Sequence, residues 1–336
     1  MGTVSILRLG RIRAAALVAT AALITTSNIT AVASAGVIAA EGDGHAAPSS
    51  FRHGRPLEPV PTSDSDWKAT AQALGRSGKL SADHTVYRVG FPRSDLKVTS
   101  KGVAIKPGFA LGSYAAFARY GDGKAMMMGD LVITEDELGK VTNALQAAGI
   151  SQTALHKHLL AHEPPVWWTH IHATGDPVGI ARRIRAALDQ TATPPASPPS
   201  SPPAIDLDTA AVDAALRAKG TNDGGIYKFT FARREHVSSG NRIAPAGMGV
   251  STGLNFQPTG GGKAAINGDF VMTAPEVQNV IRALRRGGVD IVELHNHTLD
   301  DQPRMFYMHF WAVGDPVKLA RTLHEGVAAG NLKPAH

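Results

Sequence analysis

The sequence contains no cysteine among its 336 residues. This absence excludes a disulfide framework, a cysteine-ligated zinc site, a catalytic thiol and a lipid anchor attached to cysteine. Aromatic residues are few, at 6%, and charged residues make up only 18%. Apolar residues still reach 43%, which is enough to bury a core and is not typical of a disordered chain. Histidine is abundant, with 14 copies, so any metal or acid–base chemistry must rely on it.

The positive charge is concentrated at the start of the chain. The formal net charge is +6, and three arginines between residues 8 and 13 supply half of it. They precede an apolar run over residues 14–24 and the small residues Ala33-Ser34-Ala35, which is the pattern of a cleaved signal peptide. The run is too short and too interrupted for a stable membrane span. We therefore expect an exported protein, secreted or held in the periplasm or cell envelope, with no stable membrane insertion after cleavage.

The remaining charge does not favour a nucleic-acid partner. Without residues 1–35 the chain has 31 basic and 28 acidic residues and no basic stripe. Nucleic-acid binding proteins usually carry a concentrated basic surface. We expect a metal ion or a small ligand as the partner instead, and the sequence leaves the oligomeric state open.

An internal duplication dominates the rest of the sequence. Residues 126–182 align without a gap with residues 265–321, and roughly two positions in five are identical. Between the two copies lies a segment with six prolines, typical of an extended linker. The predicted segments are a signal peptide (1–35), a flexible spacer (36–64), a first repeat domain (65–189), a Pro/Ser-rich linker (190–204) and a second repeat domain (205–331).

Both copies predict the same order of helices and strands. A leading amphipathic helix is followed by alternating strands, and a middle helix begins at a capping box formed by Thr134 and Glu137 in the first copy. Two strands then form a predicted hairpin, and an Asp-Pro pair begins the last helix. The equivalent signals in the second copy are Thr273 with Glu276 and Asp315-Pro316. The sequence thus predicts an α+β fold of two homologous lobes, each an antiparallel sheet flanked by helices.

Seven of the fourteen histidines lie on the strands of the two predicted hairpins. Residues two apart on a strand point to the same face of a sheet, so paired histidines on neighbouring strands converge on one patch. Converging imidazoles are a ready site for a divalent metal such as Zn²⁺. Histidines satisfied by backbone groups remain an alternative, and the sequence leaves open whether the lobes form separate sites or share one. The predicted ligands are His156, His158, His170 and His172 in the first copy and His295, His297 and His309 in the second.

Other candidate site residues have a structural explanation as well as a functional one. Asp130 and Asp269 each follow a glycine and are interpreted as turn residues or, alternatively, as catalytic acids. Metal-bound histidines need acceptors for their second nitrogen. The candidate acceptors are Glu163, Asp130, Asp269, Glu293 and Asp301. Trp168 and Tyr307 are interpreted as core residues or as the wall of a ligand pocket, and Arg93 and Arg233 as anion-binding residues or as members of salt bridges.

The common catalytic motifs are missing from the sequence. There is no Gly-x-Ser-x-Gly elbow, phosphate-binding loop, His-Glu-x-x-His helix or dinucleotide fingerprint. No nucleotide cofactor is therefore expected, and the catalytic residues of any enzyme activity remain unassigned.

Several motifs resemble a known family. The stretches ALHKHLL, WWTHIHATGDP, LHNHTL and RMFYMHFWAVGDP are similar to those of the LppY/LpqO family of exported bacterial proteins. The resemblance covers about residues 66–330, and it implies an envelope-associated protein with a duplicated domain of unknown function. The lipoprotein anchor of that family cannot apply here because this chain has no cysteine.

Three functions follow from these patterns. The first is an exported protein that binds a divalent metal or small ligand at the histidine-rich hairpins. The second is a zinc-dependent hydrolase acting on an envelope or extracellular substrate. The third is a metal-free structural or carbohydrate-binding envelope protein.

Overall fold

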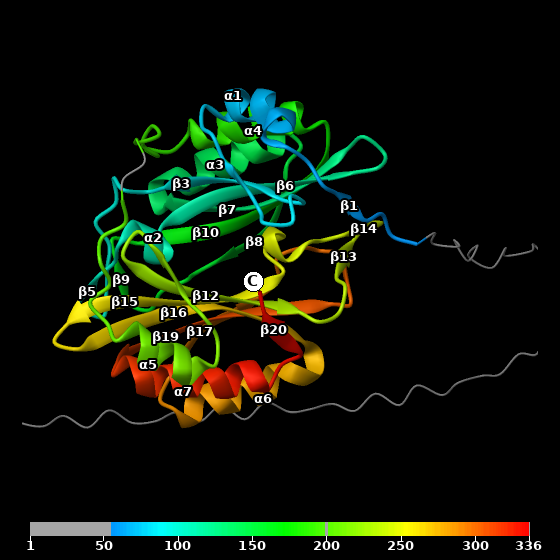
Figure 1. The fold of residues 1–336 in the computed structure, drawn as a ribbon. Helices are drawn as coiled ribbons and strands as arrows, with labels where there is room; N and C mark the ends of the chain where they lie inside the picture. The colour runs from blue at the N-terminus through cyan, green and yellow to red at the C-terminus, as the bar shows by residue number, and fades with distance from the viewer. Residues whose placement is uncertain (1–54, 199–200, 336) are drawn as a thin grey trace, which may run out of the picture. The chain divides into compact units, whose positions relative to one another are not determined.

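Each repeat forms an antiparallel sheet with helices, and the elements of the two repeats follow the same order (Figure 1). The computed structural model describes residues 55–198 and 201–335. The predicted signal peptide and most of the predicted spacer lie outside these residues. The structure confirms the predicted α+β fold of two similar lobes.

The first repeat contains the elements β1 to β10. Its helices are η1 (Asp64–Trp67), α1 (Lys68–Leu74), α2 (Pro107–Ala110), α3 (Glu135–Ala147) and α4 (Pro177–Leu188). Its strands are β1 (Pro59–Val60), β2 (Lys79–Leu80), β3 (Tyr87–Pro92), β4 (Thr99–Ser100), β5 (Val103–Ala104), β6 (Gly112–Tyr120), β7 (Ala125–Thr134), β8 (Ser151–His156), β9 (His162–Glu163) and β10 (Val166–Gly175). The main sheet has the order β2-β3-β6-β7-β10-β8, and β1 pairs with β6. The end of the predicted spacer is therefore attached to this sheet.

The second repeat contains the elements β11 to β20. Its helices are α5 (Thr209–Leu216), η2 (Ala246–Met248), α6 (Ala274–Arg286) and α7 (Pro316–Ala328). Its strands are β11 (Thr221–Asp223), β12 (Ile226–Arg233), β13 (Ser238–Ser239), β14 (Arg242–Ile243), β15 (Ser251–Gly260), β16 (Lys263–Thr273), β17 (Asp290–His295), β18 (Asp301–Gln302), β19 (Met305–Gly314) and β20 (Leu332–Pro334). The main sheet has the order β11-β12-β15-β16-β19-β17, which repeats the order of the first sheet, and β20 pairs with β12.

Local sequence signals set the helix ends as expected. The capping boxes at Thr134 and Thr273 are both formed, because each hydroxyl and the glutamate three residues later satisfy free amides of the first turn. Asp176 and Asp315 cap α4 and α7 by accepting from the backbone amides of Gly179 and Lys318. The caps at Asp176 and Asp315 fix the points at which α4 and α7 begin, directly after the histidine-bearing strands β10 and β19.

The predicted hairpins are only partly correct. Strands β8 and β10 do pair in antiparallel register, and so do β17 and β19. The connection between β8 and β10 is not a tight turn, however, because it contains β9, which pairs with β4. In the second repeat β18 takes the same role and pairs with β13. The two small three-stranded sheets formed in this way hold the segments that follow β8 and β17.

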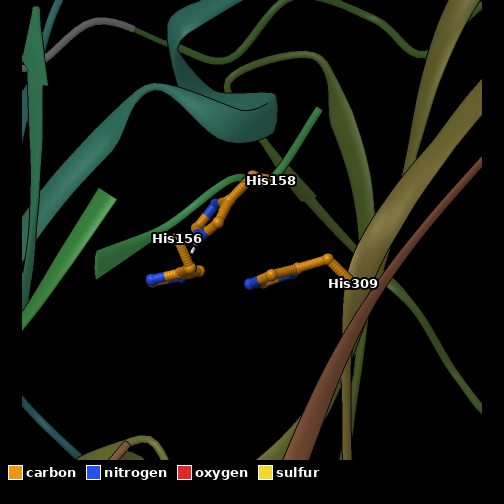
Figure 2. A group of neighbouring side chains, drawn as sticks. All are labelled: His156, His158 and His309. Atoms are coloured by element: carbon orange, nitrogen blue, oxygen red, sulfur yellow. Dashed lines mark hydrogen bonds between the residues drawn. The ribbon is translucent and has the colours of Figure 1, made fainter. Parts of the chain in front are cut away.

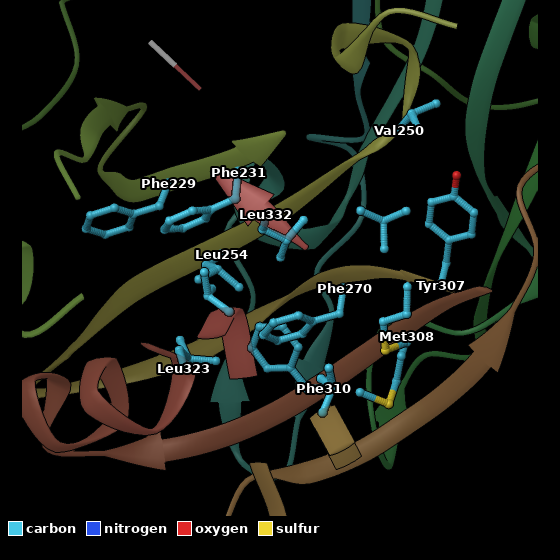
Figure 3. Close-up of a cluster of buried hydrophobic side chains, with 14 of the residues drawn as sticks. Phe229, Phe231, Val250, Leu254, Phe270, Tyr307, Met308, Phe310, Leu323 and Leu332 are labelled. Atoms are coloured by element: carbon cyan, nitrogen blue, oxygen red, sulfur yellow. The ribbon is translucent and has the colours of Figure 1, made fainter. Parts of the chain in front are cut away.

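Each main sheet has one face covered by helices. In the second repeat, Phe270 of β16 and Phe310 of β19 lie with their ring centroids 5.4 Å apart, in a core that also includes Leu323 of α7 (Figure 3). Alternation along a strand sends the neighbouring side chains Asp269 and His309 to the opposite face. Burying an aromatic ring of this kind contributes about 1.5–3 kcal/mol, which anchors the helices on this side.

The other faces of the two sheets meet each other within one compact unit that spans residues 52–336. Tyr120 donates a hydrogen bond to the Ile243 carbonyl oxygen, and Gln257 donates to the carbonyl oxygen of Ala104. Apolar side chains from both repeats pack together around these bonds, among them Trp168 and Trp311. Between the apolar contacts lies a polar region that contains the predicted site. None of the helices in the described residues is long and apolar enough to cross a membrane.

Candidate metal centre

Six histidines from the two repeats form one cluster between the facing sheets. Each histidine stacks against or tilts over a histidine of the other repeat, with ring centroids 3.8–4.0 Å apart. The pairs are His156 with His295, His158 with His309, and His170 with His297. Figure 2 shows His158 reaching toward His156, with His309 of the second repeat beside them. The two repeats therefore share one cluster, a question that the sequence left open.

The cluster follows the internal symmetry of the chain. The distance between the rings of His156 and His170 is 4.7 Å, and the equivalent distance between His295 and His309 is 4.8 Å. Matching positions in the two repeats thus have matching surroundings. A pseudo-twofold arrangement of two identical half-sites results from the duplicated sequence.

Strand geometry brings the histidines to the inner face. His170 lies within β10 and His309 within β19, and both point away from the helix-covered face. His156 and His295 are the last residues of β8 and β17. His158 was predicted on the same strand as His156, but it lies just after the end of β8. It still enters the cluster, because its Nε2 atom is 3.0 Å from the Nε2 atom of His156.

Backbone carbonyl groups fix three of the imidazoles in one tautomer. Nδ1 donates to a carbonyl oxygen in each: His170 to Gly129 at 3.3 Å, His309 to Gly268 at 2.7 Å, and His297 to Gly249 at 2.8 Å. A carbonyl oxygen only accepts, so Nδ1 carries the proton and Nε2 keeps its lone pair. Metal-bound histidines are usually oriented by such a bond on the second nitrogen.

Several imidazole nitrogens of the cluster have no hydrogen-bond partner in the described part of the chain. Nε2 of His170 and Nε2 of His309 are both buried and unpaired there. An unsatisfied buried polar atom costs about 1–3 kcal/mol, so such atoms are rare in native proteins and require an explanation. A lone pair held in a fixed direction inside a histidine cluster is what a metal ion would use.

Two carboxylates complete the cluster. Asp130 Oδ2 is 3.2 Å from His158 Nε2, and Asp269 Oδ2 is 3.0 Å from His297 Nε2. Burial raises the pKa of Asp269 to about 6. Carboxylate oxygen is a common zinc ligand together with imidazole. Both aspartates therefore lie in direct contact with histidines of the cluster.

The turn interpretation of these aspartates was wrong. Gly129-Asp130 lies within β7 and Gly268-Asp269 within β16. Glycine is required there by packing, since a Cβ atom on Gly129 would lie 2.5 Å from the carbonyl oxygen of Tyr114. Glycine and aspartate favour turns locally, but the contacts between neighbouring strands override that preference.

Burial keeps the six imidazoles in the form that binds metals. Loss of hydration is the main cause that lowers the pKa of each one, to about 3 for His309 and about 4 for His297. The pKa values of the other four are also lowered, first by burial and then mainly by the neighbouring histidines. A neutral imidazole is the metal-binding form, so no proton has to be displaced near neutral pH.

Three groups of side chains have donor atoms close enough to hold a metal ion. Within each group all ligand atoms lie within 4.8 Å of one another. The groups are His156, His158 and His309; His156, His170 and His295; and Asp269, His295 and His297. Two nitrogens bound to one tetrahedral zinc are about 3.4 Å apart, so modest side-chain movements bring these groups to binding geometry. The first and third groups share no residue and can therefore be filled together.

A cavity of about 710 Å³ opens beside the cluster. Four histidines and both aspartates reach its surface, namely His158, His170, His297, His309, Asp130 and Asp269. Its size lies within the usual range for small-molecule sites. A ligand in this cavity would be in reach of an ion bound to the cluster.

Other predicted site residues have different positions. His172, also on β10, belongs to none of the three groups. Trp168 and Tyr307 are buried and stack on His158 and His297, with ring centroids 4.5 and 3.4 Å apart, so they support the histidines from behind. The ligand-pocket interpretation of these two aromatic residues is replaced by a supporting role.

The two predicted anion-binding arginines are buried in ion pairs. Arg93 contacts Asp95 and Glu137, and Arg233 contacts Glu235 and Glu276. Neither arginine lines the cavity beside the cluster. The salt-bridge alternative is therefore correct, although the pairs are buried and not solvated as expected.

Of the candidate acceptors, only Asp130 and Asp269 reach the histidines. Glu293 accepts from the backbone amide of Lys157, and Asp301 pairs with Arg304. Sequence reasoning missed the carbonyl oxygens of Gly129, Gly249 and Gly268 as acceptors. The repeated Gly-Asp motif was the signal for two of them, because glycine permits the close strand approach that brings each carbonyl to a histidine.

Residues 68–190 and 210–329 both match the family described as a Domain of Unknown Function (DUF1259). No curated protein has significant sequence similarity to this chain. The solved structures with weak similarity include two microcompartment shell proteins. The trimeric bacterial microcompartment shell protein PduB has 13% identity over 76% of this chain and 90% of that chain, with a TM-score of 0.21. A double-ringed trimeric shell protein of the RMM microcompartment has 13% identity over 60% of this chain and 81% of that chain, with a TM-score of 0.18.

Proposed function

This chain belongs to the DUF1259 family, a domain of unknown function that it contains twice, and we propose that the two domains together bind divalent metal ions in their shared histidine cluster. The observation that carries the proposal is the pair of buried, unpartnered Nε2 atoms of His170 and His309. Each belongs to a ring whose Nδ1 atom is fixed by a glycine carbonyl. This combination of a directed lone pair and an oriented ring is the usual environment of a histidine ligand.

The arrangement accommodates two ions. One ion takes His156 and His158 of the first repeat together with His309 of the second. The other takes His295, His297 and Asp269. His170 completes this second set by the internal symmetry, since its ring is 3.8 Å from that of His297. Each ion thus has ligands from both repeats, and neither repeat alone forms the site.

The donor set favours zinc or a similar transition metal. Imidazole nitrogen is preferred by zinc, copper, nickel and iron, whereas magnesium and calcium prefer sites made of oxygen ligands. Six imidazoles and two carboxylates are present here. The ion at His156, His158 and His309 has three protein ligands, which leaves a coordination position for water or another ligand, as in catalytic zinc sites.

Equilibrium dialysis of untagged protein against Zn²⁺ tests this proposal. The wild-type chain is expected to hold about two ions, and His309→Gln about one, because a zinc site rarely survives with two protein ligands. His172→Gln is the matched control, since His172 lies on the strand of His170 but outside the cluster. Equal zinc content in the wild type and His309→Gln would contradict the proposal.

A zinc-dependent hydrolase is the second candidate, and the cavity beside the cluster favours it. The cavity would give a substrate access to the ions, and Asp130, which lines the cavity and belongs to none of the three ligand groups, would be available as a general base. Zinc-loaded protein is expected to hydrolyse an ester, a phosphoester or a cell-wall fragment, and Asp130→Asn is expected to lower that rate about 100-fold. If protein with two bound zinc ions turns over none of the three substrate types, the hydrolase hypothesis is contradicted and metal binding alone is the proposed function.

We also propose that the protein is exported, as a released member of the LppY/LpqO type. The proposal is supported by the arginines, apolar run and small residues of positions 1–35 and by the motifs that resemble those of that family. N-terminal sequencing of protein recovered outside the cytoplasm is expected to begin near residue 36. Recovery only from the cytoplasm with an intact first segment would contradict export.

A further inference from the structure

The cavity beside the cluster has a cationic side chain from each repeat. Arg88 of β3 and Lys228 of β12 both line it. They are equivalent positions, because each follows the tyrosine, Tyr87 or Tyr227, that begins the matching stretch of the two repeats. Duplication has therefore kept a positive charge at equivalent positions of the two sheets that line the cavity.

The two cations differ in how they are paired. Lys228 Nζ is 2.7 Å from Asp223 Oδ2, so its charge is largely compensated. The Arg88 guanidinium lies 3.3 Å from the ring centroid of Tyr114 and donates to the Gly247 carbonyl oxygen at 3.5 Å. Within residues 55–198 and 201–335, no carboxylate forms an ion pair with Arg88. Arg88 therefore keeps an uncompensated positive charge at the cavity.

The balance of charge in the cavity becomes positive when metal ions bind. The imidazoles are neutral, so two divalent ions contribute four positive charges against the two negative charges of Asp130 and Asp269. A bound ion is the largest local charge in a site and must be counted with the protein groups. Arg88 adds one further positive charge.

The rest of the lining suits a small polar ligand. Glycines at positions 90, 247 and 253 leave space, and polar side chains of Thr230 and Asn255 provide hydrogen-bonding groups. Apolar side chains such as Phe91 and Phe109 surround these groups. The few polar groups and the charge of Arg88 are therefore what fixes the orientation of a bound ligand.

We propose that this cavity binds a small oxyanion, a phosphate or carboxylate group, which coordinates the metal ions and is attracted by Arg88. The inference rests on the proposed metal binding. It assigns the open coordination position to a ligand class, because anionic oxygen is a good ligand for zinc and a good hydrogen-bond acceptor for guanidinium.

Calorimetric titration of the zinc-loaded full chain with inorganic phosphate, and separately with acetate, tests the inference. Binding of at least one of the two is expected, and their relative affinities distinguish a phosphate from a carboxylate ligand. Arg88→Gln is expected to weaken that binding about tenfold, which corresponds to about 1.4 kcal/mol, with unchanged zinc content. Arg88 is exposed, so the variant is expected to fold. Lys140→Gln, on the exposed side of α3, is the matched control and is expected to bind as the wild type does.

The zinc content of the same samples separates the two proposals. Protein with about two zinc ions that binds neither anion would overturn the oxyanion inference and leave metal binding intact. Equal anion affinity in the wild type and Arg88→Gln would also overturn it. Protein that holds no zinc would overturn the metal proposal and this inference with it.

Discussion

Removal of the bound metal ions is expected to lower the melting temperature by roughly 10 °C or more. A ligand present at 100 times its dissociation constant stabilises the folded state by about 2.7 kcal/mol, so two sites contribute about 5 kcal/mol. A stability change of about 1 kcal/mol shifts the melting temperature by about 2–4 °C in a domain of 150–250 residues. Metal binding also removes the cost of the unpaired nitrogens of His170 and His309. Scanning calorimetry with zinc and with a chelator measures the difference.

The double variant His170→Gln/His309→Gln provides the control for this effect. It lacks one ligand of each proposed ion, so its melting temperature is expected to be insensitive to zinc and to chelator. His172→Gln is expected to respond as the wild type does. A wild-type melting temperature that is the same with zinc and with chelator would contradict a metal role for the cluster.

Truncation of Glu137 is expected to destabilise the protein by about 3–5 kcal/mol. Glu137 Oε1 and Oε2 accept from both terminal nitrogens of Arg93, at 3.0 and 2.7 Å, and the arginine side chain is fully buried. Burial alone disfavours the charged forms of Arg93 and Glu137. Hydrogen bonds from Arg93 nevertheless lower the pKa of Glu137, and hydrogen bonds to Asp95 and Glu137 raise the pKa of Arg93. Glu137→Ala leaves the guanidinium buried with Asp95 as its remaining carboxylate. Urea denaturation measures the loss.

Asp136→Ala is the matched control for Glu137→Ala. Both residues lie in the first turn of α3, but Asp136 is exposed, so its loss removes only a favourable interaction with the helix dipole, about 0.3–1 kcal/mol. Glu276→Ala is expected to repeat the larger effect in the second repeat, since Glu276 pairs with Arg233 in the same way. A loss for Glu137→Ala no greater than that for Asp136→Ala would show that this buried pair does not stabilise the first lobe.

Local signals in the sequence were sufficient to predict the elements of each repeat. The capping box at Thr134, the cap at Asp176 and the alternation in β10 depend on residues close together in the chain, and all three are found as expected. The duplication doubled each of these signals. It also showed which histidines recur, and six of the seven predicted ligands lie in the cluster.

The parts that were not predicted depend on contacts between distant residues. Asp130 was one of five candidate acceptors that the sequence could not rank, and its position within β7 was missed because Gly129 is needed for the approach of Tyr114 on β6, which no local pattern reveals. The burial of Arg93 depends on Glu137, 44 residues later in the chain. The pairing of the two half-sites depends on how the two sheets pack, which is set by interactions such as the hydrogen bond from Asn267 to the His158 carbonyl oxygen.

The shared cluster explains why the domain occurs twice in this chain. A single copy supplies His156 and His158 on one side but has no His309 to complete the set. The duplicated chain places both halves in one compact unit, so the ligands meet without association of separate molecules. Metal binding at this position would also hold the inner faces of the two sheets together.

Anomalous diffraction at the zinc absorption edge, from a crystal of the zinc-loaded full chain, tests the central claim most directly. The account predicts two anomalous peaks within the cluster, each about 2.0–2.1 Å from imidazole nitrogens of both repeats. One peak is expected beside His156, His158 and His309, and the other beside His170, His295, His297 and Asp269. A zinc-loaded crystal with no peak among these side chains, or with zinc only at surface histidines, would contradict the account.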